Sequence, residues 1–170
     1  MIEDSVSAEG EITIEAYDSD NVPDSDELDE VEPDETRCIE NLTTAEMHAQ
    51  LAKAISPNES IDGTVDYLGF GSDGTTAQES DSELKQGEFY KDLQSVTRNG
   101  DVLTAEVEIL ESEPSGNSAI DIREVALFSG DASNAPDSSH IMWNRGTIPT
   151  IEKNENRRLV ITVKLSFSAK

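Results

Sequence analysis

Three glycines between residues 69 and 74 have the spacing of a phosphate-binding turn. Gly69, Gly71 and Gly74 spell G-x-G-x-x-G and come after a short apolar run. In dinucleotide-binding proteins this turn joins a strand to a helix, and the N-terminal end of that helix meets the pyrophosphate. These glycines can have that role only if a helix begins directly after Gly74.

The segment after Gly74 lacks the features of such a helix. Between Gly74 and Phe89 the only apolar residues are Ala77 and Leu84, so no amphipathic helix could pack there on a sheet. Asp73 and several later carboxylates would also repel a pyrophosphate. We therefore interpret the glycines as a strand end and a turn, where a small residue allows a bulge or a close backbone approach. An extended polar segment is expected after the turn.

Other catalytic or metal-binding patterns are sparse. The chain has two histidines, and His140 lacks the G-x-S-x-G pattern of a nucleophile elbow. Its one cysteine, Cys38, excludes an intrachain disulfide, and no Cys/His spacing is typical of zinc. The acidic run 18–35 departs from a calcium-binding loop at the fifth and sixth positions. We expect no enzymatic activity and no cofactor, although loosely bound cations would be compatible with this run.

Aromatic and basic residues near the C-terminal end form a candidate contact surface. Trp143 and Arg145 occur together in IMWNRG, and Arg157 and Arg158 come shortly after them. Because tryptophan and arginine often dominate protein–protein contacts, these four residues are candidates for a subunit interface. For Trp143 and Arg145 the alternative is a core tryptophan and an ion-pair partner.

The charge of the chain restricts its surroundings. There are 37 Asp+Glu against 12 Lys+Arg, and the formal net charge is -25. A folded surface this acidic repels itself in dilute salt, whereas in molar salt the Debye length is only about 3 Å. We therefore expect a molar-salt environment, that of a haloarchaeon or its virus. Binding to nucleic acid or to an anionic membrane is disfavoured, because phosphate groups require positive patches.

The two ends of the chain differ in charge. Residues 1–36 are rich in carboxylates and are predicted to form an acidic N-terminal arm of strand and loop, ahead of a main module at 37–170. The last thirty residues are locally basic. One interpretation is a solvated acidic arm. The other is an arm that docks on a basic face of its own or a neighbouring subunit.

Alternating apolar and polar residues predict strands. Within the arm, residues 11–17 alternate as a half-buried strand does. In 119–129 the alternation changes phase at Arg123-Glu124, which predicts a bulge or a bend. Further strands are predicted at 64–70, 101–110, 140–146 and 158–168.

One helix is predicted over residues 43–56. Thr43 and Glu46 have the T-x-x-E spacing of a capping box, apolar residues recur along one face, and Pro57 comes directly after the helix. With the strands, this predicts a mostly β protein: an antiparallel, jelly-roll-like β-sandwich with one helix at an edge and the acidic N-terminal arm.

Four stretches, taken in order, resemble a virion-protein module of tailed viruses that occurs in tail-fibre and baseplate proteins. They are RCIENLTTAEMHAQLAKAI (37–55), DYLGFGSDGTTAQESDSEL (66–84), IREVALFSG (122–130) and IMWNRGTIPTIEKNENRRLVITVKLSFS (141–168). The matching positions are Gly69, Gly71, Asp81, Leu84, Glu124, Leu127, Phe128, Arg145 and Lys153. The chain departs from the pattern at Ala126, where glycine is frequent, and at Gly146-Thr147, where an aromatic residue is more usual nearby.

The resemblance and the acidic composition together imply a structural protein of a haloarchaeal tailed virus of the caudovirus type. We expect a non-enzymatic assembly component of the tail, baseplate or fibre attachment, or of the capsid surface as a turret or decoration. It would form a homo-oligomer, a trimer or higher ring, and contact other virion proteins. We expect it to be made in the host cytoplasm and to reside in the virion, because the sequence has no signal-peptide pattern.

An alternative is a carbohydrate-binding β-sandwich adhesion module. Tyr67, Tyr90 and Trp143 would supply its stacking surfaces. The low aromatic content, 5% of the residues, argues against this class.

We expect the melting temperature to fall when salt is lowered from about 3 M to about 0.1 M, because weaker screening leaves the acidic surface to repel itself. Thermal unfolding followed by circular dichroism in potassium chloride measures this shift. An unchanged melting temperature over that range would contradict the halophilic interpretation.

Overall fold

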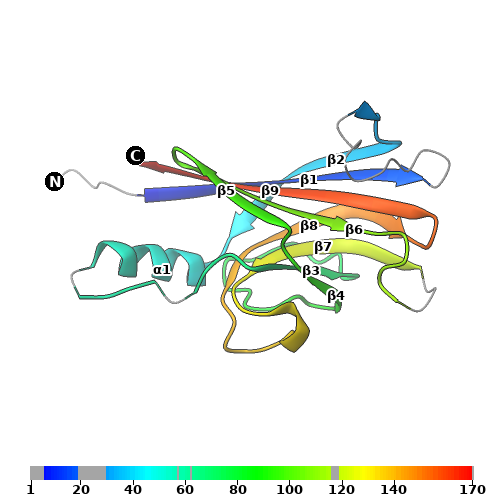
Figure 1. Cartoon of the computed structure of the whole chain (residues 1–170). Helices are drawn as coiled ribbons and strands as arrows, with labels where there is room; N and C mark the ends of the chain where they lie inside the picture. Colours follow the sequence, from blue (N-terminus) through cyan, green and yellow to red (C-terminus); the bar gives the residue numbers. More distant parts are fainter. Residues whose placement is uncertain (1–5, 19–29, 57, 62, 116–118, 170) are drawn as a thin grey trace.

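The structure, a computed structural model, describes residues 6–18, 30–56, 58–61, 63–115 and 119–169. Within these residues it contains nine strands, one α-helix and a short 3₁₀ helix (Figure 1). The elements are β1 (Val6–Asp18), β2 (Glu35–Thr43), α1 (Ala45–Ile55), β3 (Tyr67–Gly71), β4 (Gly87–Asp92), β5 (Ser95–Asn99), β6 (Val102–Ile109), β7 (Ile120–Phe128), η2 (Ala132–Asn134), β8 (Met142–Lys153) and β9 (Arg157–Ala169).

The nine strands form one antiparallel sheet in the order β4-β3-β7-β8-β2-β1-β9-β6-β5. The sheet curls over its own apolar face as a half-barrel. Strand β2 joins the two halves: residues 35–41 pair with β1, whereas Leu42 and Thr43 pair with β8. The two edge strands, β4 and β5, are consecutive in the chain with only residues 93–94 between them. The prediction of a mostly β, antiparallel protein with one helix is confirmed.

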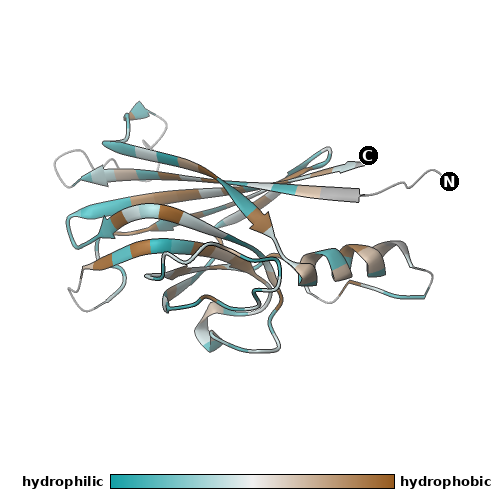
Figure 2. Ribbon diagram, turned by 180° about the vertical axis from the view of Figure 1, so that it is seen from behind, coloured by the Kyte–Doolittle hydropathy of each residue, from teal (hydrophilic) through white to brown (hydrophobic). Residues whose placement is uncertain are grey.

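The main core lies between the two halves of the curled sheet. Strand β9 shows how the sequence builds it, because Leu159, Ile161, Val163 and Leu165 are all buried while the residues between them are not. Figure 2 shows the same alternation of hydrophobic and hydrophilic positions along other strands. Since side chains alternate across a strand, one apolar face per strand is enough to fill this core.

Strand β1 lies in the interior of the sheet, between β2 and β9. It pairs with β9 from Val6 to Asp18 and contributes Ile12, Ile14 and Ala16 to the core. The strand predicted at 11–17 is therefore present and is longer than expected. Residues 1–5 and 19–29, the rest of the predicted arm's most acidic part, are outside the described residues.

The helix is confirmed, but its N-cap differs from the prediction. Thr44, and not Thr43, caps α1, and its hydroxyl accepts a hydrogen bond from the Met47 N–H at 3.2 Å. Glu46 does not close a capping box; its carboxylate accepts from the N–H of Met142 at 3.0 Å. The helix lies beyond the end of the sheet at which β1 begins and β9 ends (Figure 1).

The phase change predicted near Arg123-Glu124 is confirmed as an irregularity in β7. Its register with β8 shifts between Ile122 and Glu124. As a result Ile122, Val125 and Leu127 all reach the main core although their phases differ. Three strands were not predicted: β2, β4 and β5.

We expect Ile14→Ala to lower the free energy of unfolding by about 2–5 kcal/mol, because it removes buried methyl groups and leaves a cavity. Thr13→Ala, at the next position on the opposite face of β1, is the matched control and should change it by less than about 0.5 kcal/mol. Urea unfolding at constant molar salt measures both. Equal, small effects would show that β1 does not stabilise the sheet.

Candidate functional site

A polar segment, residues 72–86, crosses the face of β3, β7 and β8 that is turned away from the main core. It is held by Arg145, whose side chain is fully buried. The Arg145 Nε donates to a Glu124 oxygen at 2.8 Å, and Nη1 donates to an Asp81 oxygen at 3.0 Å. A third bond runs from Nη2 to the carbonyl of Thr75 at 3.1 Å. One arginine thus joins β8, β7 and two positions of the crossing segment, Thr75 and Asp81.

The two carboxylates also bind other groups of the same segment. Glu124 accepts from the backbone N–H of Lys85 at 3.1 Å and of Gln86 at 2.8 Å. Asp81 forms an ion pair with the Lys85 ammonium at 2.6 Å. Buried charges are tolerated only when they are paired and hydrogen-bonded, and this cluster meets that condition. We name Arg145, Asp81 and Glu124 the arginine cluster.

The pKa of Asp81 reflects these contacts. Burial on its own raises the pKa of this carboxyl, but the hydrogen bonds from Lys85 and from the Gln78 N–H, with the positive charges of Arg145 and Lys85, outweigh burial. The pKa is held below its usual 3.8. Asp81 therefore contributes stability that is fully present above pH 3.8 and is lost as the pH falls through its lower folded-state pKa.

The glycines at 69 and 71 allow the crossing segment to approach the sheet. A Cβ at Gly71 would lie 2.4 Å from both the Gln86 carbonyl oxygen and a Glu124 carboxylate oxygen. One at Gly69 would lie 2.9 Å from the side chain of Leu84. The register between β3 and β4 also shifts at Gly71. The interpretation of these glycines as a bulge and a close backbone approach is therefore confirmed.

Two of the four candidate interface residues lie inside the protomer. Arg145 belongs to the arginine cluster. Trp143 is buried, and its indole N–H donates to the Thr64 carbonyl at 2.9 Å. The structure thus agrees with the alternative given for these two residues: Trp143 is a core tryptophan, and Arg145 is an ion-pair partner.

The other two candidates, Arg157 and Arg158, pair with carboxylates of the same chain. Arg157 contacts Asp18 at 2.7 Å and Glu35 at 3.2 Å. Arg158 contacts Glu108 at 3.0 Å. Because Asp18 and Glu35 belong to the acidic segment 1–36, part of the charge attraction between the two ends of the chain is satisfied within one protomer.

A cleft of about 370 Å³ lies between the crossing segment and the loop that contains η2. Its floor is made of three rings that belong to a second, smaller apolar cluster. Tyr67 stacks on Phe128 with ring centroids 5.0 Å apart, and Tyr90 meets Tyr67 edge-on at 6.1 Å. The remaining lining residues are Glu46, Ser82, Glu83, Leu84, Pro136, Asp137 and Ser138. We name this the aromatic cleft.

The aromatic cleft has an acidic rim. Glu46, Glu83 and Asp137 line it, and none of the described lining residues is a lysine or arginine. Burial raises the pKa of Tyr67 to about 12, and the neighbouring Tyr90 and Asp137 act in the same direction. The Tyr67 hydroxyl forms a hydrogen bond with His140 Nδ1 at 2.9 Å. The cleft therefore combines ring surface with negative charge.

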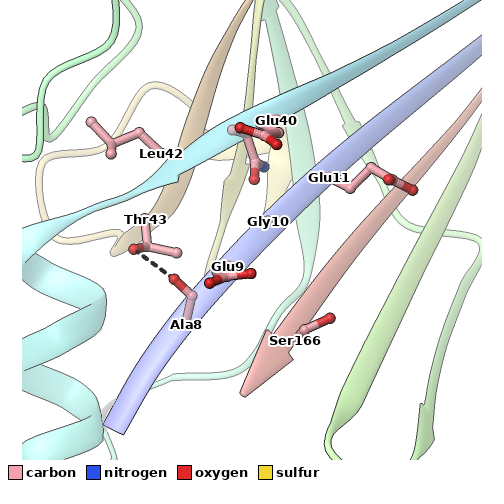
Figure 3. Close-up of a pocket in the computed structure, with 9 residues that line it drawn as sticks. Ala8, Glu9, Gly10, Glu11, Glu40, Leu42, Thr43 and Ser166 are labelled. Atoms are coloured by element: carbon pink, nitrogen blue, oxygen red, sulfur yellow. Dashed lines mark hydrogen bonds between the residues drawn. The ribbon is translucent and has the colours of Figure 1, made fainter. Parts of the chain in front are cut away.

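A second hollow, of about 520 Å³, lies where β2 leaves β1 to join β8 (Figure 3). Glu11 and Glu40 lie directly opposite each other across the two strands, an unfavourable pair of like charges. The Asn41 amide lies against Gly10, where a Cβ would be 1.6 Å from its oxygen. Neither polar atom of this amide has a hydrogen-bond partner in the described part of the chain.

Comparisons with known proteins assign no family to this site. No family model matches the sequence, and no match was found among curated proteins or solved structures. Within the described ranges, no three histidine, cysteine, aspartate or glutamate side chains are arranged to hold a metal ion. The helices of the same ranges are too short or too polar to cross a membrane.

Sequence reasoning named Tyr67, Tyr90 and Trp143 as stacking residues, and the structure brings the first two together. Trp143 does not line the cleft. Phe128 and the three rim carboxylates were not predicted as cleft residues. Alternation in β7 alone points Phe128 away from Leu127, but only the strand pairing places it beside Tyr67.

We expect Arg145→Met to lower the free energy of unfolding by about 3–5 kcal/mol, because it leaves two buried carboxylates without their partner. Adding Asp81→Asn and Glu124→Gln to this variant should restore part of the loss, since the buried negative charges are then removed. Chemical unfolding at fixed pH and molar salt compares the variants. A loss below about 1 kcal/mol for the single variant would contradict the account of the cluster.

Proposed function

We propose that this protein is a non-enzymatic structural component of a virion, from a tailed virus of a halophilic archaeon. In the virion it forms a homo-oligomer and contacts other virion proteins, in the tail, baseplate or fibre attachment or on the capsid surface. The observation that carries the proposal is where the residues of the sequence resemblance lie in three dimensions.

Those nine residues are scattered over 85 positions from Gly69 to Lys153. Six of them fall into two contact sets. Asp81, Glu124 and Arg145 make up the arginine cluster. Gly71 provides the space for Glu124, and Gly69 lies under Leu84. A motif whose members depend on one another physically is stronger support for a shared module than the same residues dispersed over the surface would be.

The treatment of charge supports the halophilic part of the proposal. Cations of the described residues are largely used in ion pairs within the chain, which leaves the excess carboxylates exposed to solvent. The paired cations are Arg37, Lys85, Lys91, Arg123, Arg145, Arg157 and Arg158. Lys153 is buried, and its ammonium donates to the carbonyl of Asn154 at 2.8 Å. Such a surface requires concentrated counterions.

We propose further that the half-barrel acts as a jelly-roll-like β-sandwich, with the β5-β6-β9-β1-β2 half packed on the β2-β8-β7-β3-β4 half. Support comes from the core, which receives side chains from both halves. It also comes from the two corners, because β2 is shared and the chain passes from β4 directly to β5. Strands that change sheets at corners are a known way to join two packed layers.

A carbohydrate-binding adhesion module is the second candidate. The observation that favours it is the meeting of Tyr67 and Tyr90 in the aromatic cleft, with hydroxyl and carboxylate groups nearby. Trp143, the third residue of that hypothesis, is used in the core instead.

Two measurements test the virion proposal. Light scattering after size-exclusion chromatography in about 3 M potassium chloride, the salt range in which surface repulsion is screened, should give a mass of three or more protomers. Mass spectrometry of purified haloarchaeal tailed-virus particles should detect the protein. A strictly monomeric protein that is absent from virions would overturn the proposal.

A further inference from the structure

We propose that the aromatic cleft is a receptor for a lysine or arginine side chain presented by a neighbouring protein subunit. This inference rests on the proposed assembly function. It adds that the residue through which the partner binds here carries a positive charge. Its elements are the ring floor, the rim carboxylates and the fixed walls of the cleft.

The floor of the cleft suits a cation. Ring faces carry partial negative charge and attract ammonium and guanidinium groups within about 6 Å of the ring centre. Tyr90 is only partly buried, and Tyr67 and Phe128 lie behind it. The aliphatic part of a lysine or arginine side chain would also bury apolar surface against Leu84 and Pro136.

The rim supplies acceptors that the chain itself leaves unused. Glu83 is exposed and makes no hydrogen bond or ion pair with any described residue. Glu46 accepts from the Met142 N–H through one oxygen. Asp137 accepts from the Ser139 N–H through one oxygen, and its other oxygen lies 4.0 Å from His140 Nε2. An incoming ammonium or guanidinium group would therefore meet negative charge and free lone pairs together.

The walls of the cleft are fixed before any ligand enters. Residues 82–84 come directly after Asp81, which the arginine cluster and Lys85 hold in place. On the opposite wall, His140 is hydrogen-bonded to the floor through Tyr67, and its backbone N–H donates to the Asp137 carbonyl at 3.0 Å. A preformed site loses less conformational entropy on binding, which favours a contact made by a single side chain.

A cation fits these groups better than a neutral sugar. The side-chain donors that line the cleft are hydroxyls of Ser82, Ser138 and the tyrosines, whereas its acceptors carry three negative charges. A sugar would leave these charges unneutralised. A partly enclosed cation would retain its attraction in molar salt, because screening acts mainly on exposed charges.

The test uses short peptides as probes and the full-length protein. We would titrate acetyl-Gly-Lys-Gly-amide and acetyl-Gly-Arg-Gly-amide into the protein at constant molar salt and monitor tyrosine ring resonances by NMR. The matched neutral probe carries Nε-acetyl-lysine. We expect shifts at Tyr90 with the charged peptides, and at least about fivefold weaker binding of the acetylated one, as expected for loss of about 1 kcal/mol of cation contact.

Variants locate the site. Glu83→Gln should weaken binding of the charged peptides at least about threefold, because it removes one negative charge from the rim. Tyr90→Leu should abolish the contribution of the Tyr90 ring to the binding of the cation. Glu88→Gln, an exposed carboxylate on β4 outside the cleft, is the matched control and should bind like the unaltered protein.

Three results would overturn the inference: equal binding of charged and acetylated peptides, no binding, or binding of methyl glycosides in their place with the same dependence on Tyr90. The last result would favour the carbohydrate alternative. If peptide binding fails while the protein is still oligomeric and present in virions, the inference alone is wrong. If the protein is monomeric and absent from virions, the proposed function fails, whatever the peptides do.

Discussion

The buried pairing of Arg145 with Asp81 and Glu124 is the constraint on which much of this structure depends. An arginine that is 0% exposed must have its charge balanced inside the protein. Glu124 supplies one negative charge from the neighbouring strand. Asp81 can supply the second only if residues 72–86 lie across the sheet. The conformation of a polar segment without regular secondary structure is therefore determined by electrostatics, and the wall of the aromatic cleft is determined with it.

Regular alternation was the part of the fold that could be predicted. Strands β6, β7 and β9 show it, because their inward positions are apolar, and the bulge in β7 was visible as a change of phase. Strand β2 was missed since its inward positions include Arg37 and Asn41, so no apolar face marks it. Strand β5 is largely exposed, and burial in β4 does not alternate from one residue to the next. Both therefore lack the apolar and polar alternation that a half-buried strand shows.

The candidate site was less accessible to sequence reasoning, for a related reason. Arg145 and Asp81 are 64 positions apart, and neither residue indicates its partner in a chain with 37 carboxylates. Trp143 and Arg145 have the composition of a contact surface, yet both serve the interior. Tyr67 and Tyr90 become neighbours only through the pairing of β3 with β4. Long-range pairing, rather than local pattern, decides which of these side chains meet.

The pairing of β1 with β9 has a mechanical consequence. Val6 pairs with Ala169 at one end of this ladder and Asp18 with Arg157 at the other, so the start of β1 and the end of β9 lie side by side (Figure 1). A pulling force applied at these two adjacent points would act along the inter-strand hydrogen bonds, which run perpendicular to antiparallel strands. The hydrogen bonds would then break one after another from the loaded end. In shear geometry, by contrast, they would bear the force together.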